Sequence, residues 1–167
     1  MVTAMARTDM GSTTATLWTA VAKTAAETGL FGPCVISANG VDCPATGSAQ
    51  PATYRVSQEG EALYVSLLMA DRWQSHSIEA DLLNTGDKIE ELVAEELAEL
   101  DYLERRPGDA IAACEHFRSE DKLFTFRSRV PVAASDPHAA AVVSLWLRAY
   151  EAAFRRLGDM DAGGGED

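Results

Sequence analysis

The chain has 167 residues, of which 47% are hydrophobic and 24% are charged. This length fits one domain, and the composition is that of a globular protein rather than a disordered chain, a collagen or a disulfide-framed miniprotein. Fourteen basic against 26 acidic residues leave a net charge of -12. Because binding to a phosphate backbone depends on Lys and Arg, this balance disfavours nucleic acid and anionic membranes as partners.

The three cysteines, Cys34, Cys43 and Cys114, are few and odd in number, which argues against a secreted disulfide framework. We expect reduced thiols, with Cys114 an inert buried one; a Cys34–Cys43 bridge across the intervening loop stays open as the alternative. No CxxC or HxxxH spacing occurs, so we expect no metal and no cofactor. The chain also lacks a signal-type apolar region and any run of 18 apolar residues, which predicts a cytoplasmic protein.

The small, polar residues at the start of the chain and the spacing of apolar residues after them predict the first elements. Residues 1–12 are expected to be a flexible leader, and residues 13–28 have the apolar spacing of a helix. Residues 31–51 are rich in Pro and Gly and are expected to form a long loop that holds one short strand or turn. Alternating apolar residues then predict a hairpin of two strands that ends at residue 69, and a third strand over residues 73–82.

In the second half, the apolar spacing predicts a helix over residues 88–103. Asp87 has the position of a capping residue at its start, and Pro107 and Gly108 mark where it must have ended. A second hairpin follows over residues 111–130, and Pro137 starts a final amphipathic helix. Hairpin-linked strands imply an antiparallel sheet, and amphipathic helices need that sheet as a partner. We therefore expect an α+β fold of about five antiparallel strands and three helices in the order α-β-β-β-α-β-β-α. It forms one domain over residues 13–158, followed by a flexible acidic tail over residues 159–167.

Motifs that carry chemistry are missing or weak. There is no phosphate-binding GxxxxGK[ST] loop, GxGxxG turn, GxSxG elbow or HExxH helix, and we expect no enzyme activity. The nearest polar cluster combines Glu115, His116 and Arg118 with Arg127 across the predicted hairpin. Ordinary cross-strand pairing is the favoured interpretation. An anion site is the alternative, because arginine presents a planar fork of donors to carboxylate or phosphate.

The order of elements resembles that of the type III secretion chaperone-like fold, whose relatives include small bacterial domains of the YbjN type. The resemblance covers residues 13–158, and the loop over residues 31–51 departs from the compact version of that fold. It implies a homodimer that binds an extended segment of a partner protein without catalysis. The stretches that would carry this binding are residues 63–69, 73–82 and 88–103.

These observations lead to one functional hypothesis and one alternative. The hypothesis is a non-enzymatic, chaperone-like protein-binding module, a homodimer that accepts a protein segment on the face or edge of its sheet. The alternative is a small anionic-ligand binder or enzyme built on the cluster around His116. For the hypothesis, the expected contact residues are Leu67, Met69, Trp73 and Phe126.

Overall fold

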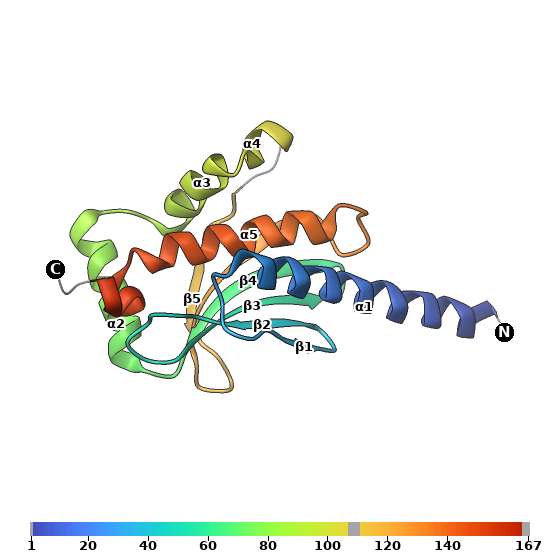
Figure 1. Ribbon diagram of the computed structural model, residues 1–167, viewed down its shortest axis with the longest axis horizontal. Coiled ribbons are helices and arrows are strands. Elements are labelled where there is room, and N and C mark those ends of the chain that lie inside the picture. Colours follow the sequence, from blue (N-terminus) through green and yellow to red (C-terminus); the bar gives the residue numbers. More distant parts are fainter. Residues whose placement is uncertain (1, 107–110, 165–167) are drawn as a thin grey trace.

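The computed structural model describes residues 2–106 and 111–164. Within them, six strands form one antiparallel sheet in the order β1-β2-β3-β4-β6-β5 (Figure 1). The predicted α+β class with an antiparallel sheet is therefore confirmed. The elements in chain order are α1 (Val2–Thr28), β1 (Val35–Ser37), β2 (Gly40–Pro44), β3 (Ala52–Glu59), β4 (Ala62–Met69), α2 (Arg72–Thr85), α3 (Ile89–Glu99), α4 (Tyr102–Arg105), β5 (Glu115–Arg118), β6 (Phe124–Ala133), α5 (Ala139–Arg155) and the 3-10 helix η1 (Gly158–Gly164).

One face of the sheet holds the core. Helix α5 contacts β3, β4 and β6, and α1 lies beside it over β1 and β2 (Figure 1). Alternate residues of β4 from Leu63 to Met69 are buried beneath these helices, as strand geometry requires. From α5, the rings of Trp146, Tyr150 and Phe154 fill the space above them. The predicted first hairpin is confirmed. The predicted final helix is confirmed too, but it begins at Ala139 rather than at Pro137, which lies in the preceding turn.

The sheet begins earlier than the sequence predicts. The expected loop over residues 31–51 contains the hairpin of β1 and β2, which closes at the pair Ser37↔Gly40. A Cβ atom at Gly40 would lie only 2.0 Å from the carbonyl oxygen of Val56 on β3. Glycine is therefore what lets β2 approach β3, although glycine in the sequence reads as a loop former. Four strands, rather than three, precede the first internal helix.

The strand predicted over residues 73–82 is wrong, because this segment lies in helix α2. The Asp71 side chain caps the helix by accepting from the backbone N–H of Gln74 at 2.8 Å, and Gly86 ends it with a φ of 78°. The buried residues Gln74 and Ile78 lie four positions apart, which is helical spacing. The alternation along this segment was too polar on both faces to distinguish a strand from a helix.

The helix predicted over residues 88–103 is divided. Helix α3 ends at Glu99, and α4 begins at Tyr102 after Asp101 takes a left-handed φ of 59°. Lys88, rather than Asp87, occupies the N-cap position of α3, and it makes no side-chain cap bond. Helix α4 ends at Arg105, and the predicted end near residues 107–108 lies outside the described residues.

The second hairpin is shorter than predicted on its first strand. Strand β5 begins at Glu115, and residues 111–114 approach the sheet without joining it. The N–H of Cys114 donates to Oε2 of Glu90 at 3.4 Å, so it is satisfied by α3 rather than by a neighbouring strand. This contact explains why an apolar run does not continue the sheet.

Both predicted chain ends also need correction. Helix α1 begins at Val2, so residues 2–12 are helical rather than a leader; this stretch contains Ala, Met and Arg, which favour helices, and no proline. At the other end, η1 packs on α2 (Figure 1). Met160 is 2% exposed, and the N–H of Asp159 donates to Oγ of Ser77 at 3.0 Å. The tail predicted from residue 159 is therefore part of the fold at least as far as Asp161.

Among the described helices, none is both long enough and apolar enough to cross a bilayer.

Replacing Gly158 with alanine tests the docking of η1 on α2. Gly158 has a φ of 49°, and a Cβ atom there would lie 2.3 Å from Oγ of Ser77 and 2.7 Å from the backbone nitrogen of Ile78. Gly60 has a similar φ of 60° with no atom within 4 Å of the same position, so Gly60→Ala is the matched control. We expect the control to lose about 1–2 kcal/mol of unfolding free energy through backbone strain. Gly158→Ala should lose about 1–3 kcal/mol more through overpacking.

Urea denaturation followed by circular dichroism measures both losses. Equal losses in the two variants would mean that η1 does not pack against α2 in solution.

Candidate functional site

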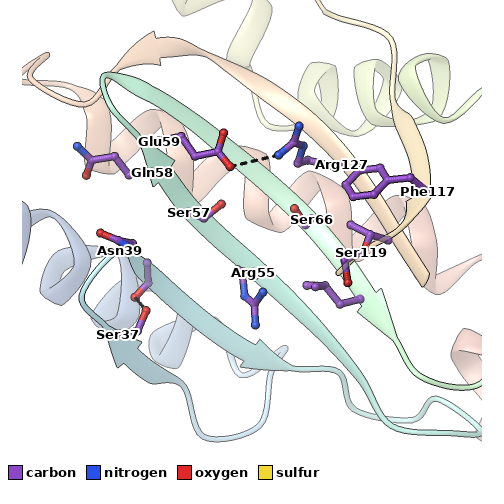
Figure 2. Close-up of a pocket in the computed structure, with 13 residues that line it drawn as sticks. Ser37, Asn39, Arg55, Ser57, Gln58, Glu59, Ser66, Phe117, Ser119 and Arg127 are labelled. Carbon is purple, nitrogen blue, oxygen red and sulfur yellow. Dashed lines mark hydrogen bonds and ion pairs between the residues drawn. The ribbon is translucent and has the colours of Figure 1, made fainter. Parts of the chain in front are cut away.

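The sheet face opposite α1 and α5 carries a hollow of about 400 Å³, which we call the cup. None of the described elements covers this face. Figure 2 shows polar side chains from the β1–β2 turn, from β3 and from β6 pointing into the cup. Its floor holds the hydroxyl-bearing residues Ser57, Ser66 and Thr125, and Phe117 closes one side. The sequence alone could not show that this face is hollowed.

The two arginines of the cup are each held by carboxylates of the same face. Arg55 makes a two-pronged bond to Asp42, its partner in the β2–β3 register, with Nε–Oδ1 at 2.7 Å and Nη2–Oδ2 at 3.0 Å. Hydrogen bonding to Asp42 raises the pKa of Arg55 above its ordinary value. The guanidinium is therefore permanently charged, and Asp42 already neutralises it.

Arg127 is held both by charge and by stacking. Its guanidinium lies 3.5 Å from Glu59 and 3.2 Å from Glu115. Its Cζ also lies 4.3 Å from the ring centroid of Tyr64 and 5.4 Å from that of Phe117. The Nε atom is buried and has no hydrogen-bond partner within the described part of the chain. These contacts hold the Arg127 side chain in the wall of the cup, so its guanidinium is not free to turn toward an anion.

The four residues of the predicted anion cluster do not converge. Glu115 and Arg127 are register partners on the open face, which supports the interpretation of ordinary cross-strand pairing. His116 points to the opposite face, where its ring stacks on Phe126 with centroids 3.9 Å apart. Arg118 lies on that face too, because it follows His116 by two residues.

His116 connects the edge of the sheet to α2. Its Nδ1 donates to the carbonyl oxygen of Thr125, with the two atoms 3.0 Å apart, and its Nε2 is paired with the carboxylate of Glu79 on α2. Both ring nitrogens are thus engaged, and the ring fixes β5 against the helix. The sequence could not anticipate this pairing, because it placed residue 79 on a strand.

Three of the four predicted contact residues are inaccessible. Leu67, Met69 and Phe126 are at most 2% exposed, because they lie on the strand positions that face the helices. Their prediction as surface contacts is wrong. Trp73, on α2, is 73% exposed and remains accessible.

A second hollow, of about 410 Å³, lies between α2, α3 and β5. We call it the α2–α3 groove. Phe126 and Ile89 form its apolar floor, and Leu83, which is 84% exposed, stands at its rim. The carboxylates of Glu79 and Glu90 flank it. The sequence missed this groove because one of its walls is the helix that was predicted as a strand.

Cys114 lines the same groove but is not an activated nucleophile. Its sulfur lies 3.4 Å from Oη of Tyr150, which in turn lies 2.8 Å from Oγ of Ser128. Burial raises the pKa of Cys114, which disfavours the reactive thiolate. In the described ranges, no three His, Cys, Asp or Glu side chains gather closely enough to hold a metal ion.

Comparison with known proteins adds little to this geometry. No protein-family model matches the chain, and no curated protein matches it. Among solved structures, the chain is similar to an uncharacterized protein from Methanothermobacter thermautotrophicus. The two are 12% identical over 79% of this chain and 90% of that one, with a TM-score of 0.29. A likeness at that level carries no argument about fold or function.

Replacing Arg127 with lysine tests whether this arginine supports the cup by stacking. Lysine keeps the charge but loses the planar group that lies against Tyr64 and Phe117. We expect Arg127→Lys to lower the unfolding free energy by about 0.5–1 kcal/mol. Glu59→Gln, which removes only an exposed ion pair, should change it by less than about 0.5 kcal/mol.

Chemical denaturation gives both values, and repeating Arg127→Lys in a Tyr64→Leu background isolates the stacking. An undiminished loss in that background would contradict the proposed contact with Tyr64.

Proposed function

We propose that the protein is a non-enzymatic protein-binding module, and that its α2–α3 groove takes a segment of the partner. The observation that carries this proposal is an open hollow between two helices, with apolar residues in its lining and Leu83, which is 84% exposed, at its rim. Interfaces of this kind usually centre on a few apolar anchors surrounded by polar groups. Phe126 lies at the bottom of the groove but is only 2% exposed, so the contact would be made by the leucines of α2 instead.

The apolar part of the groove supports an anchoring side chain. Leu82 and Leu83 come from the last turn of α2, and Ile89 comes from the first turn of α3. They are held on either side of the short connection through Gly86, so the walls belong to rigid elements rather than to a loop. A preformed apolar hollow of this size accepts one large aliphatic or aromatic side chain without reorganising.

The charge of the groove supports a basic partner. Helix α3 contains five glutamates and no basic residue, and residues 85–110 hold nine acids against three bases. Glu79, which is paired with His116, and Glu90 line the groove together with Lys88, so the acidic character comes mainly from the surrounding helix α3. A partner segment that carries Lys or Arg beside its apolar anchor would be attracted to this surface and oriented on it.

The same charges bear on the predicted homodimer, which stays a prediction. A two-fold contact through the groove would bring the glutamates of one copy against those of the other. We therefore assign the groove to a different protein rather than to a second copy. The alternative of an anionic-ligand site around His116 is not carried forward, because its four residues lie on opposite faces of the sheet.

A matched pair of variants tests the groove. The probe is a short fluorescein-labelled peptide in which leucines are flanked by lysines, and the readout is fluorescence anisotropy. Leu83→Ser removes the exposed apolar rim, and we expect it to weaken binding about tenfold or more. Val35→Ser removes a side chain that is 63% exposed on β1, at the opposite edge of the sheet, and should leave the affinity unchanged.

The charge component has its own controls. A peptide with glutamate in place of lysine should not bind, and binding of the lysine peptide should weaken as the salt concentration rises. The proposal fails if the lysine peptide does not bind the native chain, if Leu83→Ser binds it normally, or if Val35→Ser loses as much affinity.

A further inference from the structure

We propose that Cys34 and Cys43 form an oxidation-sensitive dithiol, which a peroxide converts into a disulfide between the residue that precedes β1 and strand β2. The two sulfur atoms lie 3.1 Å apart and are already in contact. Both thiols are free in this structure. The site is independent of the α2–α3 groove and of the proposed partner.

The sheet register places the two residues opposite each other. The β1–β2 ladder runs through Ile36↔Val41 and Val35↔Asp42, and one further step along it brings Cys34 against Cys43. Opposite residues of antiparallel strands have Cα atoms about 4.5–5.5 Å apart, inside the range of about 4.4–6.8 Å that a disulfide spans. Rotation of the side chains can therefore close the bond without moving the backbone.

The surroundings of the two sulfurs differ, which assigns them different roles. Cys43 is completely buried beneath the helices, whereas Cys34 is partly exposed at the edge of the sheet. Burial, together with the neighbouring Cys34, raises the pKa of Cys43, so this thiol is a poor first nucleophile. Because Cys34 is the less buried of the two residues, it is the one that an oxidant meets first.

The reaction proceeds in two balanced steps. The Cys34 thiolate attacks one oxygen of hydrogen peroxide, the O–O bond breaks, and hydroxide leaves and takes up a proton as water. The Cys34 sulfenic acid that forms is then attacked by the Cys43 sulfur, the S–O bond breaks, and a second water leaves. Two thiols are oxidised by two electrons in all, and one peroxide is reduced to two waters.

The bond would fasten a part of the sheet that borders the cup. It closes a ring from residue 34 to residue 43, and the turn within that ring carries Ser37 and Asn39 at the rim of the cup (Figure 2). Oxidation would therefore restrict the movement of one side of this hollow. Cys114, which lies far along the chain and contacts Tyr150, serves as an internal reference thiol.

Peroxide treatment of the reduced full-length chain tests the proposal. After treatment, the chain is denatured, its remaining thiols are alkylated with N-ethylmaleimide, and its intact mass is measured. We expect one alkylated thiol instead of three, and a proteolytic peptide pair that links Cys34 to Cys43. The oxidised chain should also melt at a higher temperature than the reduced chain, and dithiothreitol should reverse both changes.

Variants identify the roles of the two sulfurs. Cys114→Ser should still form the bridge and leave no thiol to alkylate. Cys34→Ser should leave Cys43 and Cys114 reduced; its side chain is partly exposed, so this variant is the safer test if Cys43→Ser does not fold. In Cys43→Ser, the sulfenic acid of Cys34 should accumulate and react with dimedone.

The proposal is overturned by any of three results. In the first, the native chain keeps three alkylatable thiols after peroxide treatment. In the second, Cys34 carries oxygen while Cys43 stays free. In the third, the bridge involves Cys114 or a second chain.

Discussion

The packing of α5 against β3, β4 and β6 determines what every strand residue can do. Trp146, Tyr150 and Phe154 are buried against the alternate apolar residues of β4, and Tyr150 anchors its hydroxyl on Ser128 of β6 at 2.8 Å. Because successive strand residues point to opposite faces, the residues that point away from the helices lie outside the core, where several of them line the cup. The cup and the core are thus two results of a single arrangement, and no strand residue can serve both.

That constraint explains which features could be predicted from the sequence. The hairpin of β3 and β4 and helix α5 have regular hydrophobic periods over their whole length, so both their type and their position were predictable. The pairing of Glu115 with Arg127 was predictable for the same reason, since it depends only on the register of one hairpin. The buried position of Leu67 follows from this parity as well, and it shows why a regular apolar strand residue is a poor candidate for surface contact.

The features that escaped prediction depend on contacts between distant segments. Helix α2 is held in place by η1, where the N–H of Gly158 donates to Oδ2 of Asp81 at 2.5 Å. The spacing of apolar residues within α2 gives no indication of this contact. The division between α3 and α4 depends on a left-handed Asp101, which residue type alone does not indicate. The α2–α3 groove could not be recognised until α2 was known to be a helix, because Leu82 and Leu83 line it only in that conformation.

The two edges of the sheet are secured by different means. At the β5 edge, His116 is paired with Glu79 of α2 on one face, and Glu115 is paired with Arg127 on the other. Side chains on both faces of β5 are therefore bonded to neighbouring elements. At the β1 edge, the three strand residues are all exposed and have no ion pair among the contacts described. Charged side chains protect an edge strand from pairing with foreign strands, and so does a very short strand length such as that of β1. The contact between the sulfurs of Cys34 and Cys43 lies beside this edge, so a covalent bond there would link the residue before β1 directly to β2.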